Sequence, residues 1–278
     1  MKSPYLYPYK IPNSLQLRTK MSSQEEGEAV FGERTLEVIT ERRCCRSFCP
    51  REVGAGLVEQ LLLAVRNVPS SQNTQPWGIS VVVGESLAAL SAALLSAFEA
   101  TPVAEVKPDY RNRPSPLPAA EQERLADYGR TYYSHLQIQR DDAEARRGVE
   151  RRNYTFFGAP VVLILHTTAL AVEGTFLDCG IFLGTLLHAV ASFGLGACPQ
   201  FSIAKFPAVV REQLSMADDR SILCAIAIGF PDAAAAVNSF KPKRAPLTES
   251  VTWHGLNQPI SGIRRPSFLR SVHTVAAL

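Results

Sequence analysis

The chain has 278 residues, of which 46% are hydrophobic and 20% are charged, the balance of a globular protein with a substantial core. Its formal net charge of +3 argues against a nucleic-acid-binding protein, which would carry a concentrated basic face. The apolar runs fall short of the roughly 18–20 residues that a membrane-spanning helix needs. We therefore expect a cytoplasmic protein that binds neither nucleic acid nor membranes.

The first thirty residues offer little material for a hydrophobic core, and we expect residues 1–30 to form a flexible N-terminal arm. Residues 1–20 carry basic residues but no acidic ones, and they lack the apolar segment of a secretory signal. A leader that directs import into an organelle is the alternative for this segment. We expect residues 31–278 to form a single domain.

Hydrophobic periodicity predicts the regular elements of the first half of that domain. A short amphipathic helix is expected over residues 35–40, and a stronger one over residues 56–68 stops at Pro69 because proline breaks a helix. A β-branched run over residues 79–83 predicts a strand, and an Ala- and Leu-rich run over residues 87–100 predicts a helix.

The second half begins with a proline-rich stretch, residues 101–119, which we expect to be a long loop or lid. Residues 121–152 are strongly charged and carry Tyr128, Tyr132 and Tyr133, a pattern that predicts a pair of surface helices with an aromatic stripe. The remaining expected elements are strands over residues 161–165 and 221–228 and helices over residues 176–193 and 207–214.

Strands and helices therefore alternate, with a surplus of helices and no linker that would divide two domains. This order predicts an α+β or α/β domain in which helices cover a modest sheet. The helix expected over residues 176–193 is apolar on nearly every side, so we expect it to be buried.

The six cysteines give no indication of a metal site. Four of them lie in or beside apolar segments, and none belongs to a paired Cys-x-x-Cys set with zinc spacing. We do not expect Cys45 and Cys49 to bind a metal. Because no secretory signal is recognised, reduced thiols are the default expectation.

Three arginines gather in the run Arg42-Arg43-Cys44-Cys45-Arg46. The planar and permanently charged guanidinium group matches phosphate oxygens, so the cluster is a candidate phosphate site. A solvated surface with ordinary ion pairs is the alternative. Neither a P-loop nor a dinucleotide-binding glycine motif is present in the sequence, so any nucleotide would be held by side chains and loop amides.

A polar, loop-forming run from Pro69 to Trp77 lies at the other end of the helix expected over residues 56–68. Its Ser, Gln and Asn side chains can hydrogen-bond the polar edge of a ring, and Trp77 would anchor it by packing. A well-capped turn with a structural role is the alternative. A cationic cluster next to a hydrogen-bonding loop suits a bound phosphorylated cofactor.

No acid–base or nucleophile constellation stands out in the sequence. His166 and His188 lie in apolar segments and are expected in the core. Neither a Gly-x-Ser-x-Gly nor a His-Glu-x-x-His motif is present. We therefore expect no catalytic side chain, and if the protein is an enzyme, a cofactor carries its chemistry.

The segments Arg42–Phe48 and Pro69–Trp77 are followed by further short motifs. Each motif is weak alone, but in this order, over about residues 36–255, they resemble the FMN-dependent nitroreductase family and its nitrobenzoate-reductase-like oxidoreductases. The further motifs are Arg152-Asn153-Tyr154-x-Phe156-Phe157-Gly158-Ala159-Pro160, Leu177-Asp178-x-Gly180, Gly194-Leu195-Gly196-Ala197-Cys198-Pro199-Gln200, Ile228-Gly229-Phe230-Pro231-Asp232 and Arg244-Ala245-Pro246-Leu247.

The resemblance implies an α+β nitroreductase-like fold, with a central and mostly antiparallel sheet covered by helices, in an interlocked homodimer with FMN at the subunit interface. It implies an enzyme that uses NAD(P)H to reduce nitroaromatic, quinone or similar electron-poor acceptors by a ping-pong mechanism. One alternative is an FMN-dependent dehydrogenase or oxidase that acts on an organic metabolite without NAD(P)H. Another is a flavin-binding protein without catalysis.

The resemblance also implies which residues bind FMN. Those expected along the phosphate and ribityl chain are Arg42, Arg43, Cys44 and Arg46, and Arg244 with Lys241 or Lys243 would complete the phosphate site. Pro69, Ser70, Ser71 and Asn73 would come from the other subunit. Pro199, Gln200 and Phe201 would present backbone groups near the reactive edge of the flavin, where an amide N–H can stabilise developing charge.

The chain departs from the family pattern at two places. Cys44 stands where serine is usual, and a thiol is a weaker hydrogen-bond donor than a hydroxyl. Because Cys44 and Cys45 lie beside three arginines, acidic and oxidisable thiols are a further hypothesis. Gly184 stands where relatives carry a polar residue, a change that would widen the pocket or loosen the dimer contact. The segment 101–152 is the expected substrate lid.

Overall fold

The computed structural model describes residues 35–255 of the chain. The chain divides into two compact units, and the fold described below belongs to the unit made of residues 41–259. Of the other unit, residues 35–40 are described, and they are helical as predicted. The arm expected over residues 1–30 lies outside the described residues, so this arm, the single domain over residues 31–278 and the cytoplasmic location stay predictions.

Four strands form one antiparallel sheet in the order β1-β2-β4-β3. The central strand β4 is buried without a break from Ser221 to Gly229, as expected for a strand with both faces covered. The sheet and its helices confirm the predicted α+β fold with an antiparallel sheet. The strands are β1 (Gly78–Val83), β2 (Val161–Thr168), β3 (Gly196–Gln200) and β4 (Arg220–Gly229).

Strand β3 was not among the predicted elements. Its sequence contains glycine and proline, both of which are depleted in strands, so local propensity argues against it. Its pairing with β4, from Gly196 opposite Gly229 to Gln200 opposite Ala225, outweighs that propensity. Pro199 is tolerated because β3 is the last strand of the sheet, where a missing N–H need not break the ladder.

The helices follow the predicted order with small differences at their ends. The helix after the arginine cluster ends at Val65 rather than Val68, and the short helix α8 was not predicted. The helices are α2 (Ala55–Val65), α3 (Gly84–Ala100), α4 (Ala119–His135), α5 (Ala143–Tyr154), α6 (Glu173–Ser192), α7 (Pro207–Gln213) and α8 (Ala236–Ser239).

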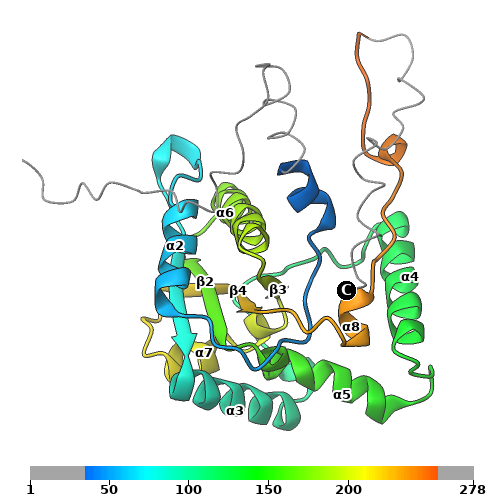
Figure 1. The fold of residues 1–278 in the computed structure, drawn as a ribbon, viewed down its shortest axis with the longest axis horizontal. Helices are drawn as coiled ribbons and strands as arrows, with labels where there is room; N and C mark the ends of the chain where they lie inside the picture. The colour runs from blue at the N-terminus through cyan, green and yellow to red at the C-terminus, as the bar shows by residue number, and fades with distance from the viewer. Residues whose placement is uncertain (1–34, 256–278) are drawn as a thin grey trace, which may run out of the picture. The chain divides into compact units, whose positions relative to one another are not determined.

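Helices cover both faces of the sheet (Figure 1). On one face, Leu61 of α2 and Leu186 of α6 pack with Leu163 of β2 in one buried cluster. On the other face, Leu90 of α3 packs with Ile164 of β2 in a second cluster, which α7 also joins. Because neighbouring residues of β2 point to opposite faces, the alternation of the strand builds both cores.

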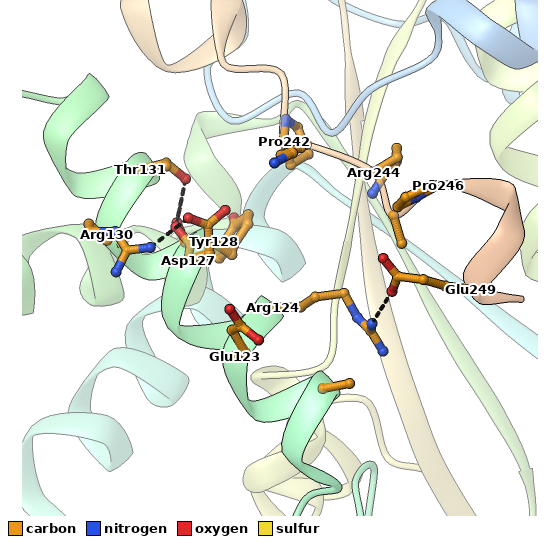
Figure 2. Close-up of a pocket in the computed structure, with 13 residues that line it drawn as sticks. Glu123, Arg124, Asp127, Tyr128, Arg130, Thr131, Pro242, Arg244, Pro246 and Glu249 are labelled. Carbon is orange, nitrogen blue, oxygen red and sulfur yellow. Dashed lines mark hydrogen bonds and ion pairs between the residues drawn. The ribbon is translucent and has the colours of Figure 1, made fainter.

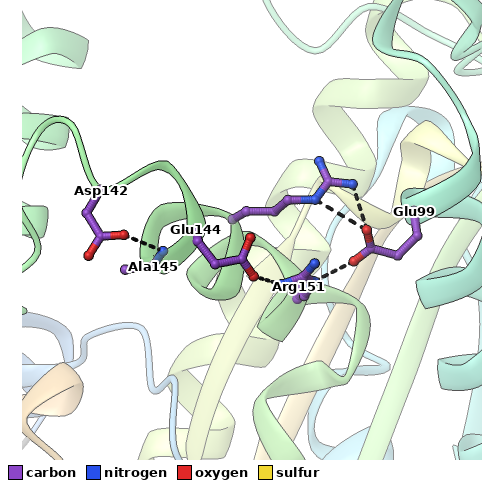
Figure 3. Close-up of polar contacts among 6 residues, drawn as sticks. Glu99, Asp142, Glu144, Ala145 and Arg151 are labelled. Carbon is purple, nitrogen blue, oxygen red and sulfur yellow. Dashed lines mark hydrogen bonds and ion pairs between the residues drawn. The ribbon is translucent and has the colours of Figure 1, made fainter.

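Charged side chains tie α5 to α3 (Figure 3). Glu99 of α3 accepts hydrogen bonds from Arg151 and from Arg147, whose Nη2 lies 2.7 Å from the carboxylate. Asp142 caps α5 by accepting a hydrogen bond from the Ala145 amide at 2.9 Å. Each exposed pair contributes at most about 1 kcal/mol, so their main effect is to orient α5.

Within the single chain helix α6 is buried on one side, so the predicted burial is confirmed for that side only. Leu186 is fully buried, whereas Leu177 is 67% exposed and Ile181 is 39% exposed. By length and composition alone, α6 could also cross a membrane. Its contacts are those of a core helix in a globular protein, since its Phe182 stacks on Trp77 with ring centres 5.0 Å apart.

We predict that Gly229→Ala lowers the free energy of unfolding by about 1–3 kcal/mol, the usual cost of overpacking. A Cβ at Gly229 would lie 2.8 Å from Pro160 Cδ and 2.9 Å from Phe48 Cδ1. Urea unfolding followed by tryptophan fluorescence measures the effect. Gly56→Ala is the control, because a Cβ there meets no atom within 4 Å and alanine favours the helix. Equal midpoints for the Gly229→Ala variant and the parent would contradict this packing.

Candidate functional site

The arginine-bearing segment, residues 42–49, lies in extended form along the edge of the sheet. Cys44 forms a parallel bridge with Ala197 of β3, and Phe48 forms an antiparallel bridge with Pro231. The Cys45 amide donates to the Ala197 carbonyl at 2.9 Å. Because β3 is an edge strand with unpaired backbone groups, this segment extends the sheet and fixes the position of the arginines.

Asn238 of α8 holds the same segment from the other side. Its Oδ1 accepts a hydrogen bond from the Arg46 amide at 2.7 Å, and its Nδ2 donates to the Ser47 carbonyl at 2.8 Å. The same Nδ2 also donates to the Asp232 carbonyl at 2.9 Å. With only 8% of its surface exposed, Asn238 joins three backbone groups from two segments, and we call this set of bonds the Asn238 clamp.

Arg46 points towards helix α4. Its Nη2 donates to the Tyr128 hydroxyl at 3.1 Å, and its guanidinium carbon lies 5.2 Å from the centre of the Tyr132 ring. Burial raises the pKa of both tyrosine hydroxyls, so both stay neutral at physiological pH. Tyr128 and Tyr132, part of the aromatic stripe predicted on this helix, therefore orient Arg46. This role of the stripe was not predicted from the sequence.

The other cations of the cluster lie around Cys44. Arg42 is half-buried and hydrogen-bonds the Cys44 thiol, whereas Arg43 is exposed and acts electrostatically on Cys45. Arg152 of α5 adds a further cation, because its Nη2 donates to the Arg46 carbonyl at 2.8 Å. The three arginines of the cluster and Arg152 thus gather along one short stretch of the sheet edge.

The C-terminal segment brings further cations to α4. Arg244 and Lys243 line a pocket of about 510 Å³ with Tyr128, and the ion pair between Arg124 and Glu249, at 3.0 Å, lies across it (Figure 2). Tyr128 therefore touches Arg46 on one side and this pocket on the other. Lys241 is exposed and pairs with Glu41 at 3.4 Å, which leaves its ammonium close to the start of the arginine segment.

The end of β3 carries the residues expected near a flavin ring. Gln200 is 2% exposed, and its Nε2 donates to the Asn153 carbonyl at 2.6 Å, while its Oε1 is buried without a hydrogen-bond partner. The Ser202 hydroxyl is buried in the same unpaired state. Pro199 is half-buried and Phe201 is 43% exposed. Since a buried unpaired acceptor costs about 1–3 kcal/mol, this end of β3 can accept a polar ligand.

The Pro69–Trp77 loop is fixed to α6. The Ser71 amide donates to both carboxylate oxygens of Asp178, at 3.1 and 3.2 Å, and the Ser70 hydroxyl accepts from the Gln75 amide at 2.9 Å. Asn73 has a φ of 60°, a left-handed conformation that asparagine tolerates better than most residues. Pro69, Ser71 and Asn73 are exposed, so their side chains face away from the core of this subunit.

The loop and the arginine segment do not meet within this subunit. The loop's hydrogen bonds go to itself, to α6 and to Thr167 of β2. Those of the arginine segment go to β3, α4, α5, α8 and residues 230–232. The eleven residues of α2, which rise by about 16 Å, separate the two ends. Figure 1 shows the loop at the far end of α2 from the arginine segment.

Three residues of the site were absent from the predicted binding set. Asp178 was quoted only as part of a motif, Tyr128 only as part of an aromatic stripe, and Asn238 carried no sequence signal. His166 and His188 are half-buried rather than buried in the core. Among the described residues, no cluster of His, Cys, Asp and Glu side chains could hold a metal ion.

Comparison with known sequences identifies relatives over most of the chain. A sequence model described as the nitroreductase family matches residues 39–230. The 4-nitrobenzoate reductase of Pseudomonas putida is 36% identical over 210 residues, which make up 74% of this chain and 89% of that protein. Nitroreductase NfnB of Mycolicibacterium smegmatis (strain ATCC 700084 / mc(2)155) is 33% identical over 216 residues, 77% of this chain and 89% of that protein.

Comparison with solved structures gives the same result. The FMN and NADPH-dependent nitroreductase NfnB from sphigopyxis sp. strain HMH has a TM-score of 0.77 at 32% identity, covering 80% of this chain and 99% of that chain. The FMN-dependent nitroreductase NfnB from Mycobacterium smegmatis, solved in complex with NADPH, has a TM-score of 0.76 at 31% identity, with 81% and 99% covered.

We predict that Asn238→Ala lowers the free energy of unfolding by about 1–3 kcal/mol, because the Arg46 amide loses its acceptor and two carbonyls lose their donor. Hydrogen exchange at the Arg46 amide should accelerate more than exchange in β4. The exposed Asn67 provides the control, since Asn67→Ala should stay within about 0.5 kcal/mol of the parent. An unchanged exchange rate at Arg46 would mean that the clamp does not hold the segment.

Proposed function

Because the chain belongs to the nitroreductase family, as its motifs predicted, we propose that it is an FMN-dependent NAD(P)H oxidoreductase. Its proposed acceptors are nitroaromatics, quinones and similar electron-poor compounds. The relatives named 4-nitrobenzoate reductase support the first of these acceptor classes. The relatives that depend on FMN and NADPH support the cofactor and the electron donor.

The observation that carries the proposal is the bridge between Cys44 and Ala197 on β3. This bridge places the arginines beside the strand whose far end presents Pro199, Gln200 and Phe201. FMN combines a dianionic phosphate with a polar aromatic ring, so it needs cations at one end and hydrogen-bonding groups at the other. The chain offers both along one edge of its sheet, and the unpaired Gln200 Oε1 suits a polar ligand at the ring end.

Arg46 is prepared for phosphate binding by its neighbours. The hydrogen bond to Tyr128 and the contact with the Tyr132 ring restrict its rotamers, so less side-chain entropy is lost when it binds an anion. Arg42 acts on the same Cys44 thiol as Arg46 and supplies a second charge. Arg244 and Lys241, from the C-terminal segment, are proposed to complete the phosphate site, since both are exposed and close to α4 or to residue 41.

Bound FMN would supply the redox chemistry, accepting hydride from NAD(P)H and then delivering electrons to the acceptor. The residues of this chain hold and orient the cofactor and shape the space above its ring. Because donor and acceptor would use that same space in turn, we propose a ping-pong mechanism. Helix α4 and the segment 101–119 are the proposed lid of this space, in line with the contact between Arg46 and Tyr128.

The uncovered side of α6 supports a homodimer. Leu177 and Ile181 expose apolar surface on this helix, and a second copy of the chain would remove it from water. The Pro69–Trp77 loop is held against the same helix by the hydrogen bond from the Ser71 amide to Asp178. We propose that Ser70, Ser71 and Asn73 reach the FMN of the partner subunit, because they lie one helix length from the arginines of their own subunit.

We predict that the purified chain carries or can be loaded with FMN, and that it oxidises NADPH or NADH when a nitroarene is present. Arg42→Ala should weaken FMN binding about 10- to 100-fold, the equivalent of one charged hydrogen bond of about 1.5–3 kcal/mol. The exposed Arg66 at the end of α2 is the matched control, and Arg66→Ala should leave the dissociation constant unchanged.

The outcomes separate three functions. Anaerobic bleaching of the flavin by NADPH or NADH within the turnover time supports the proposed oxidoreductase. Tight FMN binding without reduction by either nucleotide would instead indicate an oxidase-like dehydrogenase, if an organic substrate bleaches the flavin, or a flavin-binding protein, if none does. A colourless chain that cannot be loaded with FMN would refute the proposal.

A further inference from the structure

Two thiols meet where the arginine segment joins the sheet. The bridge to Ala197 sets Cys44 beside the neighbouring residue of β3, Cys198, and both side chains pack in the cluster on the α3 side of the sheet. Each thiol is close enough to the other to shift the pKa of its neighbour, and the Cys198 thiol also donates to the Pro199 carbonyl at 3.8 Å. This pair was not foreseen from the sequence, where the two cysteines are far apart.

Cys45 does not belong to the pair, although it follows Cys44 in the chain. Its side chain lies against Gly196, where a Cβ would come within 2.8 Å of the Cys45 Sγ. Its Sγ donates to the Ser47 carbonyl at 3.1 Å, and burial raises the pKa of its thiol. The hypothesis that Cys44 and Cys45 act together is therefore replaced by a pair formed with Cys198.

The electrostatic surroundings favour one negative charge shared by the pair. Hydrogen bonding from Cys198, aided by the charges of Arg46 and Arg42, lowers the pKa of Cys44 to about 6. The same hydrogen bond and deep burial raise the pKa of Cys198 well above its ordinary value. At neutral pH the pair thus consists of a Cys44 thiolate and a Cys198 thiol, and Cys44 is the more exposed of the two.

We propose that Cys44 and Cys198 form a redox-sensitive modification site, in which Cys44 reacts with a hydroperoxide and Cys198 then closes a disulfide across the FMN site. A thiolate, not a thiol, is the reactive nucleophile, and redox-sensing cysteines combine a positive environment with partial exposure and a nearby second thiol. The disulfide requires the two sulfur atoms, which lie in the same cluster beside the Cys44–Ala197 bridge, to approach to about 2 Å.

The chemistry balances with hydrogen peroxide as the oxidant. The Cys44 thiolate attacks one peroxide oxygen, the O–O bond breaks, and hydroxide leaves while Cys44 becomes a sulfenic acid. Cys198 then loses its proton and attacks the Cys44 sulfur, which releases the sulfenic oxygen as water once that proton is transferred. In total, one thiolate and one thiol give up two electrons and one proton, and the peroxide becomes one water and one hydroxide, which takes a proton from the solvent.

The consequence for binding rests on the proposed function, in which Cys44 contacts FMN. A disulfide would remove the Cys44 thiol as a contact and fix its side chain towards β3, so oxidation should weaken FMN binding. Bound FMN should in turn cover Cys44 and slow its oxidation. A dithiol reductant reverses the disulfide and restores the site. The disulfide itself can be detected without FMN, so its formation is tested separately from the proposed function.

The first experiment maps disulfides in the full chain after treatment with hydrogen peroxide. We expect a peptide in which Cys44 is linked to Cys198, lost on treatment with dithiothreitol and less abundant when excess FMN is present. In Cys198→Ser, Cys44 should instead be trapped as a sulfenic acid by dimedone. Cys49→Ser, which alters a partly exposed thiol of the same segment, should form the disulfide as the parent does. A parent chain without the Cys44–Cys198 link refutes the proposal.

The second measurement is the pH dependence of Cys44 alkylation by iodoacetamide. Because the Cys44 thiol is protonated below its pKa, the rate of its alkylation should fall as the pH is lowered, with a midpoint near pH 6 in the parent. In Cys198→Ala the midpoint should move towards the ordinary thiol value of 9.0, since the thiolate loses a hydrogen-bond donor. Equal midpoints would overturn the pairing.

The effect of the disulfide on the FMN site is measured as a change in the affinity of the chain for FMN. The oxidised chain should bind FMN at least about tenfold more weakly than the same sample after reduction. A disulfide that leaves FMN affinity unchanged would refute the regulatory role and leave the FMN assignment standing, whereas a disulfide in a chain that never binds FMN would refute the proposed function alone.

Discussion

The Asn238 clamp is the interaction on which the candidate site depends. An extended segment with three arginines is hard to fix, because it is short and its side chains repel one another. Asn238 solves this by giving the segment the hydrogen bonds that a neighbouring strand would give, at 2.7 and 2.8 Å. On the other side, the Ala197 carbonyl accepts from the Cys45 amide at 2.9 Å. The segment is thus held between α8 and β3 before any ligand binds.

This arrangement concentrates positive charge without burying an unpaired cation. The Arg46 guanidinium donates a hydrogen bond to Tyr128 and lies over the Tyr132 ring, while Arg42 is half-buried beside Cys44. Together with the nearby Cys198 thiol, the same charges lower the pKa of the Cys44 thiol. At the proposed FMN site, a cysteine where the family motif has serine would therefore have two effects: it would weaken a hydrogen bond to the cofactor and introduce a group that can be oxidised.

The sequence predicts well those elements whose buried residues follow a continuous apolar run or a helical repeat. Strands β1, β2 and β4 are β-branched and apolar, and α2 and α3 carry apolar residues at helical spacing, so their approximate positions follow from local pattern alone. β3 and α8 depend on tertiary pairing. Gly196 and Pro199 disfavour a strand, and the four residues of α8 are too few for a periodic signal. The prediction for α6 is confirmed on one side only, because apolar residues on all sides indicate burial without saying whether the chain itself or a second copy provides it.

The residues of the site divide in the same way, into those that a local pattern predicts and those that depend on tertiary contacts. Charge and composition pointed to the arginine cluster and the polar loop, and family motifs added Pro199, Gln200 and Phe201. Asn238 and Tyr128 were missed because each acts through a contact with residues far away in the sequence, which no local pattern encodes. The pairing of Cys44 with Cys198 was missed for the same reason. The position of the Pro69–Trp77 loop, one helix length from the arginines, agrees with a site shared between two copies of the chain.

The most direct test of this account is the FMN content of mixed dimers made from Arg42→Ala and Asn73→Gly chains carrying different tags. Glycine removes the Asn73 side chain without straining its φ of 60°. If each site takes Arg42 from one subunit and Asn73 from the other, the mixed dimer has one intact site and should bind one FMN with the affinity of the parent. Mixed dimers that bind FMN no better than either variant alone would contradict a shared site.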